Sequence, residues 1–280
     1  MLPTTSSRFG TLFYCAVTIT LMLSAAASFA TTNTSVPGGV YAWPVPEGAT
    51  NVRFANKPVL VVGNTALVGI PIRQTLGPAT LSYQTGDQER SHTFDVIDKR
   101  YTEQRITLKN QEMVTPNPEQ LARIRLESAR QREVYARVSA PLDITRGFVM
   151  PLAGTTTSLY GHRRFFNDQP RSPHSGLDIA APTGTPIVAP ADAKVALVDD
   201  LYYNGKSVFL DHGQGLVTMY CHLSEQSVKT GDVVKQNQII GLVGATGRVT
   251  GPHLHWSVSL NGYRIDPLAF RSALAAAISP

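Results

Sequence analysis

The chain has 280 residues, of which 42% are hydrophobic and 16% charged, so its composition excludes an intrinsically disordered protein and allows one large or two modest domains. The formal net charge is +5, and no basic run with interleaved aromatic residues indicates nucleic-acid binding. This modest positive charge instead favours contact with an anionic surface such as an acidic cell-wall polymer.

Residues 1–30 have the pattern of a secretory signal peptide. Arg8 is the only charged residue there, an apolar stretch follows from 11 to 27, and Ser28-Phe29-Ala30 forms a small-x-small cleavage pattern. The alternative is an uncleaved membrane anchor, but threonines dilute the stretch below the roughly 20 strongly apolar residues that a bilayer requires. We therefore expect cleavage after Ala30, no stable membrane anchor afterwards, and a protein in the periplasm, the cell envelope or the extracellular space.

The predicted mature chain begins with a polar, glycine-containing segment at 31–40, which we expect to be a flexible N-terminus. Short β-type runs with turns between them follow from 41 to 115 and predict a small β-sandwich accessory domain. The runs are 59–62, 66–70, 80–83, 92–97 and 105–108, with hairpin turns at Gly63-Asn64 and Gly86-Asp87. No cluster of acids, bases or metal-ligand types occurs in this domain.

Residues 116–147 contain the best helix pattern of the chain and a linker. Asn117 suits the N-cap, Pro118 the first helical position, and Gln120 completes a capping box, so we expect a helix that runs to about Val138. Five arginines lie on it. They favour a solvated linker helix with ion pairs; the alternative is a basic face that touches the wall polymer. Pro141 ends the segment.

The β pattern returns in residues 148–271, which predict a second, antiparallel β domain and make the whole fold mainly β. The expected strands are 186–190, 194–198, 207–211, 216–220, 239–243 and 254–259, and His212 to Gly215 look like a hairpin turn. Because loss of residues 1–30 removes Cys15, the mature chain keeps only Cys221 and forms no internal disulfide. Its core must therefore hold it together.

Four histidines of this second domain lie in two short clusters, at 174–178 and 251–255, and in one single position, His222. His253 and His255 alternate with Leu254, so on a strand both imidazoles point to one side and Leu254 points toward the core. By the same alternation His222 shares a face with Tyr220, while Cys221 points away from any site built around His222 and serves as a small buried hydrophobic residue.

His174, Asp178 and one member of the His-x-His pair would supply the three ligands of a catalytic zinc site, with one Zn²⁺ per chain. His222 and the other member of the pair then remain free, with an ordinary pKa of about 6.5. One could take a proton from a metal-activated water, and the other could hold the developing oxyanion or protonate the leaving amine. Zinc would lower the pKa of that water toward roughly 7 and polarise the scissile carbonyl.

Three motifs together resemble those of the lysostaphin-type (LytM-like) zinc metallopeptidases, which cut peptidoglycan peptides. The motifs are His174-Ser175-Gly176-Leu177-Asp178, Tyr220-Cys221-His222-Leu223-Ser224 and Thr250-Gly251-Pro252-His253-Leu254-His255. The resemblance implies that His174, Asp178 and His255 bind zinc and that His222 and His253 are the catalytic pair. It also implies an antiparallel β core with the site in a groove. The preceding half more loosely resembles the β-rich N-terminal domain of some bacterial members.

Three further residues upstream of the first motif are candidates for substrate binding. Arg163 or Arg164 could bind a substrate carboxylate bidentately or form a structural salt bridge. Asn167 could hydrogen-bond across its loop or line the groove. The expected partners are peptidoglycan stem peptides or cross-links, and the sequence favours no particular oligomeric state. Two alternatives remain: a non-catalytic wall-binding or wall-enzyme-activating module on the same fold, and a secreted zinc protease of glycine-rich proteins.

Overall fold

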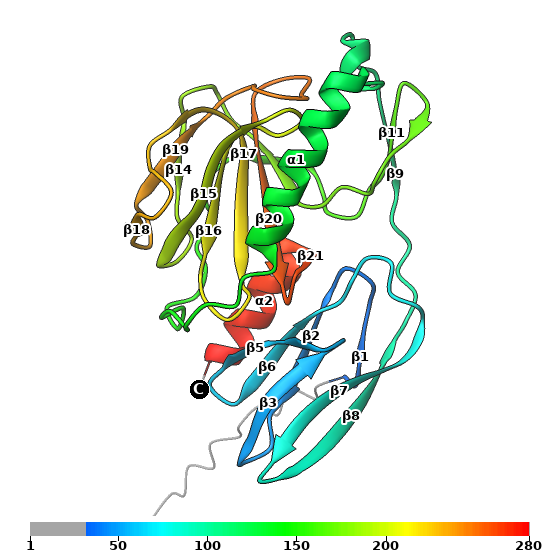
Figure 1. The fold of residues 1–280 in the computed structure, drawn as a ribbon, viewed down its shortest axis with the longest axis vertical. Helices are drawn as coiled ribbons and strands as arrows, with labels where there is room; N and C mark the ends of the chain where they lie inside the picture. Colours follow the sequence, from blue (N-terminus) through cyan, green and yellow to red (C-terminus); the bar gives the residue numbers. More distant parts are fainter. Residues whose placement is uncertain (1–31, 280) are drawn as a thin grey trace, which may run out of the picture. The chain divides into compact units, whose positions relative to one another are not determined.

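The structure, a computed structural model, describes residues 32–279, which are mainly β with two α-helices (Figure 1). The predicted fold class is confirmed. The predicted signal peptide, residues 1–30, lies outside the described residues. Within the described part, neither helix is long and apolar enough to span a bilayer.

The N-terminal lobe, residues 32–100, is built from two small sheets. One has the spatial order β1 (Thr34–Ser35), β8 (Gln88–Val96), β7 (Gly77–Thr85), β3 (Ala49–Phe54) and β4 (Lys57–Pro58). The other has the order β2 (Val40–Pro44), β6 (Thr65–Gly69) and β5 (Leu60–Val62). The predicted hairpin turns join β5 to β6 and β7 to β8. The segment 31–40, expected to be flexible, is instead paired from Thr34 onward, because β1 adds to the edge of β8.

Alternation along the strands places the aromatic side chains of this lobe between its two sheets. Tyr41 and Trp43 of β2 point inward, and the Tyr41 ring stacks on Phe94 of β8 with 3.9 Å between centroids. The tip of Tyr41 remains polar and shares a 2.7 Å hydrogen bond with Nε2 of His92. These contacts make a self-contained apolar core.

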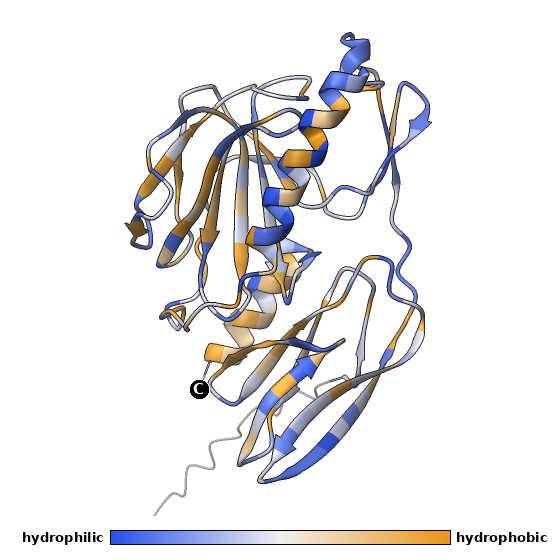
Figure 2. Cartoon of the chain, viewed as in Figure 1, coloured by the Kyte–Doolittle hydropathy of each residue, from blue (hydrophilic) through white to orange (hydrophobic). Residues whose placement is uncertain are grey.

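The sheet β2-β6-β5 is buried on both faces. One face meets the aromatic core, while Leu60, Val62 and Leu67 point the other way, into the core of the second lobe. The cover on that side is α2 (Pro267–Ile278), which buries Phe270 and Leu274. Figure 2 shows α2 as a mostly apolar helix. One apolar core thus runs across both lobes.

The helix α2 was not predicted, although its start carries clear signals. The Asp266 side chain accepts hydrogen bonds from the N–H groups of Leu268 and Ala269, and Pro267 occupies the first turn.

The C-terminal lobe, residues 101–279, contains the large antiparallel sheet that carries the site. Its main path is β10 (Thr155–Ser158), β13 (Leu177–Ala180), β20 (His253–Leu260), β17 (Val217–Gln226), β16 (Gly205–Asp211), β15 (Ala193–Leu201) and β18 (Val233–Val234). Off this path, β14 (Pro186–Val188) pairs with β19 (Ile239–Val243), β19 also pairs with β17, and β21 (Tyr263–Ile265) pairs with β20. Fully buried Tyr220 and Trp256 face each other across β17 and β20 and fill the core side of the sheet.

The other side of this sheet is partly covered by α1 (Pro118–Tyr135). The predicted capping box at Asn117 is present, but the helix ends at Tyr135, before the predicted Val138. Tyr135 packs edge-on against Phe209. The ion-pair interpretation of the helix agrees with the contact of Arg130 with Asp199, at 2.6 Å.

A fourth, small sheet lies near the site. It contains β9 (Glu103–Ile106), β11 (Arg163–Phe166) and β12 (Gln169–Pro170), and a short 3-10 helix η1 (Gln111–Met113) follows β9. The strand expected at 105–108 as part of the N-terminal domain therefore pairs with β11, whose chain continues to His174. This pairing is between residues far apart in sequence, so local patterns do not indicate it.

Candidate metal centre and groove

The structure brings His174, Asp178 and His255 together on one edge of the large sheet. Asp178 of β13 lies directly opposite His255 of β20, and His174 lies in the loop that enters β13. Asp178 Oδ1 is 2.9 Å from His174 Nε2 and 2.8 Å from His255 Nδ1, and the two nitrogens are 3.0 Å apart. All three residues are buried.

Hydrogen bonds on the outer side of each imidazole fix which nitrogen faces the centre. His174 Nδ1 donates to the carbonyl of Leu159 at 2.7 Å, so its Nε2 presents a lone pair. The Ser257 hydroxyl donates to the carbonyl of Ser175 at 2.8 Å and therefore accepts from His255 Nε2 at 2.9 Å. His255 Nδ1 is thus also left with a lone pair.

Two imidazole lone pairs and one carboxylate oxygen consequently converge on a buried point with no proton between them. Such an arrangement is repulsive unless a cation lies there, and this donor set is typical of catalytic zinc sites. The residues therefore fit a metal ion.

The glycine in the first motif is required by close packing behind the centre. A Cβ at Gly176 would lie 2.3 Å from the carbonyl oxygen of Trp256 and 2.9 Å from a ring carbon of His255. Any larger residue would push β13 away from β20 and separate Asp178 from His255.

His222 reaches the site through a break in the regular strand geometry. On β16 and β17, Lys206 pairs with Leu223 and Val208 with Tyr220, so Cys221 and His222 together oppose one residue. At this bulge His222 has a φ of 64°, a left-handed conformation that costs a non-glycine residue about 1–2 kcal/mol. The bulge turns the imidazole onto the face that carries His255.

The predicted alternation for this strand is therefore wrong. Cys221 pairs with His255 and lies on the same face of the sheet, whereas Tyr220 lies on the core side. Cys221 is fully buried and its sulfur accepts a hydrogen bond from Asn204, at 3.3 Å. Burial raises the pKa of this thiol to about 12, so it stays protonated. It is a small buried residue, as expected, but on the other side of the sheet.

His222 and His253 form a second pair of imidazoles beside the ligand set, with ring centroids 4.8 Å apart. His222 Nδ1 donates to the carbonyl of Thr246 and His253 Nδ1 to that of Gly251, both at 2.9 Å. Each ring therefore has a free Nε2. His253 Nε2 lies 3.9 Å from Asp178 Oδ1. Burial, together with the neighbouring His253 and His255, lowers the pKa of His222 to about 3, so this ring is neutral at pH 7.

The three substrate-binding candidates lie on or beside β11. Arg164 donates to Asp178 Oδ2 at 2.7 Å, on the opposite side of the carboxylate from the two histidines. Arg163 is exposed and pairs with Glu103. Asn167 hydrogen-bonds in both directions with the backbone of Leu108, at 2.8 and 3.1 Å, so it takes the option of bonding across its loop.

Two cavities flank the metal centre and together form a groove. One, of about 320 Å³, reaches Asp178, His222 and His253, and the other, of about 290 Å³, reaches His174, His222 and His255. Arg248 lines both. Its guanidinium lies between the rings of Phe166 and Tyr203, at 4.4 and 4.1 Å from their centroids.

Sequence reasoning missed two residues of this site, Arg248 and Ser257. Burial lowers the pKa of Arg248 to about 10, which still leaves it charged at pH 7. No sequence signal for it exists beyond its place in the glycine-rich approach to the third motif. Ser257 could have been found, because it lies two residues after His255 on the same strand face.

Comparison with known proteins identifies both halves of the chain. Residues 172–267 match peptidase family M23, and residues 33–99 match the peptidase family M23 N-terminal domain. A crystal structure of a peptidase M23 from Pseudomonas aeruginosa is 40% identical, covers 85% of this chain and 95% of that chain, and has a TM-score of 0.70. The resemblance predicted from the three motifs is thereby confirmed.

Curated relatives match a shorter stretch. The peptidoglycan DD-endopeptidase ShyC of Vibrio cholerae is 47% identical over 94 residues, which is 34% of this chain and 22% of that protein. The DD-carboxypeptidase/endopeptidase Mpg of Neisseria meningitidis is 42% identical over 96 residues, again 34% of this chain and 22% of that protein. The chain thus matches about a fifth of the length of these relatives.

Proposed function

Because this chain belongs to peptidase family M23, we propose that it is an exported, zinc-dependent endopeptidase that hydrolyses peptide bonds in peptidoglycan. The observation that carries the proposal is the set of three lone pairs on His174, Asp178 and His255, which are oriented toward one buried point. A zinc ion bound there would supply Lewis-acid polarisation of a carbonyl oxygen and would lower the pKa of a water molecule.

The chain's own residues divide the remaining work between them. His174 and His255 keep their ring orientation because Leu159, Ser175 and Ser257 hold their outer nitrogens. Asp178 is held in place by Arg164, which donates to the oxygen that faces away from the centre. Metal affinity is thus set by residues that are already in place before substrate arrives.

His222 and His253 are the proton-handling pair in this proposal. Each has its Nδ1 hydrogen-bonded to a carbonyl, so each can accept a proton at Nε2 without turning its ring. One imidazole takes the proton of the attacking water at its Nε2. The other, when it is protonated at Nε2, donates to the negative charge that develops on the scissile carbonyl oxygen or gives that proton to the amine that leaves. Burial of His222 favours the neutral form, which a proton acceptor requires.

Peptidoglycan as the substrate is supported by the names of the relatives, which describe a peptidoglycan DD-endopeptidase and a DD-carboxypeptidase/endopeptidase. The groove itself suits an extended peptide, since it continues on both sides of the metal centre. Export is supported by the pattern of residues 1–30, and sequencing of the mature N-terminus is expected to give Thr31 as the first residue.

Digestion of purified sacculi tests the function directly. Zinc-loaded protein is expected to release stem peptides, which mass spectrometry of the muropeptides will identify together with the bond that was cut. Asp178→Ala, which removes a ligand, should contain less than a tenth of the parent's zinc and release nothing above background. If the zinc-loaded parent releases nothing from any sacculus, the protein is a binding or activating module; if it cuts a glycine-rich protein instead, it is a secreted protease of another class.

A further inference from the structure

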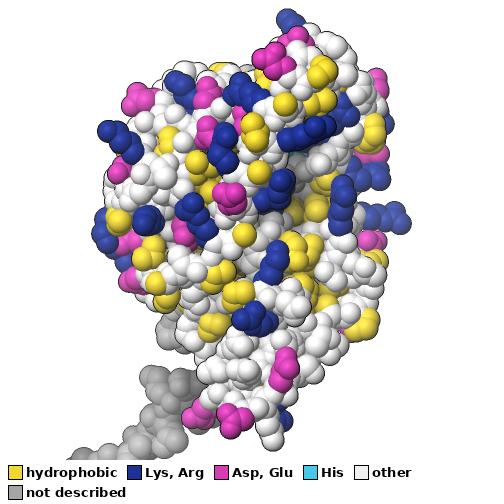
Figure 3. All heavy atoms as spheres, in the orientation of Figure 1, with side chains coloured by type: hydrophobic (Ala, Val, Ile, Leu, Met, Phe, Trp, Pro, Cys, Tyr) yellow, Lys and Arg dark blue, Asp and Glu magenta, His cyan; other side chains and the backbone are white. Residues whose placement is uncertain are grey.

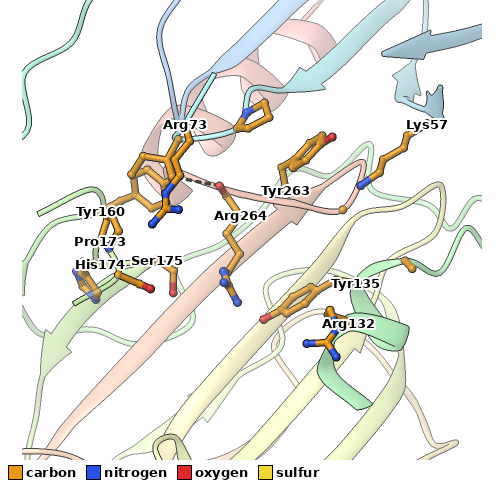
Figure 4. Close-up of a pocket in the computed structure, with 15 residues that line it drawn as sticks. Lys57, Arg73, Arg132, Tyr135, Tyr160, Pro173, His174, Ser175, Tyr263 and Arg264 are labelled. Atoms are coloured by element: carbon orange, nitrogen blue, oxygen red, sulfur yellow. Dashed lines mark hydrogen bonds between the residues drawn. The ribbon is translucent and has the colours of Figure 1, made fainter. Parts of the chain in front are cut away.

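A cavity of about 660 Å³ lies beside the metal centre rather than over it. Figure 4 shows that its walls come from the end of α1, from β21, from the loop before His174 and from two segments of the N-terminal lobe. Four cationic side chains line it: Lys57, Arg73, Arg132 and Arg264. The lining contains no Asp or Glu.

These four cations have no carboxylate partner among residues 32–279. Arginines nearby are paired instead, for example Arg130 with Asp199 and Arg164 with Asp178. Like charges gathered around one recess repel each other, and an anion in the recess removes that repulsion.

Aromatic rings hold two of the cations at the cavity wall. The Lys57 ammonium lies over the Tyr263 ring at 4.1 Å, and the Arg264 guanidinium lies over the Tyr135 ring at 5.5 Å. The Tyr160 hydroxyl donates to the backbone carbonyl of Arg264 at 2.8 Å, which fixes that residue between the cavity and the site (Figure 4). The charges are therefore placed around the recess before any ligand binds.

The cavity is continuous with the groove at the metal centre. His174, Ser175 and Arg264 line both this cavity and the 290 Å³ cavity that reaches His222 and His255. An extended chain that lies across the metal centre can therefore place its next side chains in the cationic cavity. Lys and Arg side chains also gather on the surrounding surface (Figure 3).

We propose that this cavity is a subsite for the free carboxylates of an acidic peptide substrate, with Lys57 and Arg73 of the N-terminal lobe supplying half of its charge. The proposal rests on the proposed function, because it assumes that a peptide lies across the metal centre. A recess walled on several sides by cations and tyrosines admits one chain with carboxylate side groups, whereas a membrane surface needs a flat or convex basic face. The N-terminal lobe thereby becomes part of the substrate-binding site.

Binding of an unreactive probe tests the subsite. The probe is an uncrosslinked acidic tripeptide with two free carboxylates, compared by calorimetry with the same peptide amidated at both. The variant K57Q/R73Q/R132Q leaves Arg264 and the metal groove intact. It should raise the Kd for the dicarboxylate about tenfold and leave the Kd for the diamide unchanged, because only the ion pairs are lost.

A matched control removes the same charge elsewhere. Arg90, Arg125 and Lys229 are exposed and line none of the described cavities, so R90Q/R125Q/K229Q should bind both peptides as the parent does. With a cleavable substrate, the loss in K57Q/R73Q/R132Q should fall on KM rather than on kcat.

The subsite is ruled out if K57Q/R73Q/R132Q binds the dicarboxylate as tightly as the parent, or loses affinity for both peptides equally. It is also ruled out if inorganic phosphate displaces the peptide at equal concentration, which would indicate a general anion site. A parent that binds the dicarboxylate selectively yet cuts no sacculus would leave the subsite standing and reject the proposed function instead.

Discussion

The two lobes are both built from twisted antiparallel strands, but they bury different chemistry. The core of the N-terminal lobe is apolar and aromatic, with Tyr41, Trp43 and Phe94 at its centre. The C-terminal lobe instead buries ionisable groups, among them His174, Asp178 and His255. Each of these has specific hydrogen-bond partners, because an unpaired buried polar group costs free energy. Similar strand architecture can therefore serve either packing or chemistry, according to which side chains are given buried partners.

The lobes differ also in where their backbones are irregular. In the N-terminal lobe, left-handed Ala55 and Asn56 form the exposed turn after β3, and left-handed Asn51 lies at an exposed bulge within β3. In the C-terminal lobe, His222 adopts this conformation within β17 and beside the metal centre. An irregularity held in place by the surrounding sheet is a common sign of a functional position.

The largest difference in activity is expected when one histidine of each lobe is replaced by alanine. His222→Ala should lower kcat by about 10²–10⁴-fold while the zinc content stays at one per chain, because it removes a proton acceptor and no ligand. Zinc analysis and cleavage of muropeptides will measure the two quantities.

His92→Ala is the matched control, since His92 is the histidine of the N-terminal lobe and bonds Tyr41. It should cut at the rate of the parent. Equal losses in both variants would mean that the proposed division of labour between the lobes is wrong.

A smaller effect is expected from Arg164, which contacts the metal-ligand set without belonging to it. Arg164→Gln should weaken zinc affinity about 10–100-fold, because Asp178 loses the charge that orients its carboxylate. Competition with a zinc chelator measures this affinity. Arg163→Gln changes the adjacent residue, which pairs with Glu103, and should leave zinc affinity unchanged. A similar loss in both variants would point to a general charge effect and not to positioning.

The smallest effect concerns His212, which begins the predicted turn at 212–215 and is buried. Its ring nitrogens bond the Asp192 carbonyl and the Thr218 hydroxyl, at 3.0 and 2.9 Å. Burial lowers the pKa of His212 to about 4, below its unfolded value of about 6.5. The unfolded chain then binds the extra proton between these values, so stability is full above pH 6.5 and falls as pH drops toward 4.

The lowered pKa of His212 contributes at most about 3 kcal/mol to the free energy of unfolding. Urea unfolding at pH 7, 5.5 and 4.5 should therefore show a shallower decline for His212→Gln than for the parent. His92→Gln should keep nearly the parent's slope, because His92 is only partly buried, and this partial burial lowers its pKa without enclosing the ring. If the free energy of unfolding falls equally with pH in all three proteins, His212 does not cause the loss of stability at low pH.

Local sequence signals predicted those parts of the fold that depend on neighbours in the chain. The capping box at Asn117 and the turns at Gly63 and Gly86 are set within a few residues, and all are present in the structure. The grouping of His174 with His255 followed from motif resemblance and agrees with the pairing of β13 with β20. The roles assigned to the individual site residues remain predictions.

Features that depend on distant partners could not be predicted. The bulge at His222 arises because β17 must pair with both β16 and β20, and regular alternation gives the wrong face. The position of Arg248 between Phe166 and Tyr203 joins three segments that no local pattern connects. For α2 the local signal at Asp266 existed but was overlooked.

The sheet β2-β6-β5 has a consequence for how this protein can be divided. One face of this sheet packs on the aromatic core of the N-terminal lobe, while Leu60 and Leu67 on the other face pack in the core of the C-terminal lobe. The Asn261 side chain also hydrogen-bonds the backbone of Gly69 in both directions, at 2.8 and 3.1 Å. A fragment starting after residue 100 would expose the apolar surface that this sheet covers and would lose the hydrogen bonds between Asn261 and Gly69. The N-terminal lobe is therefore a structural part of the protein. Fusion of the C-terminal lobe alone to another polypeptide would require a substitute for the three strands β2, β6 and β5.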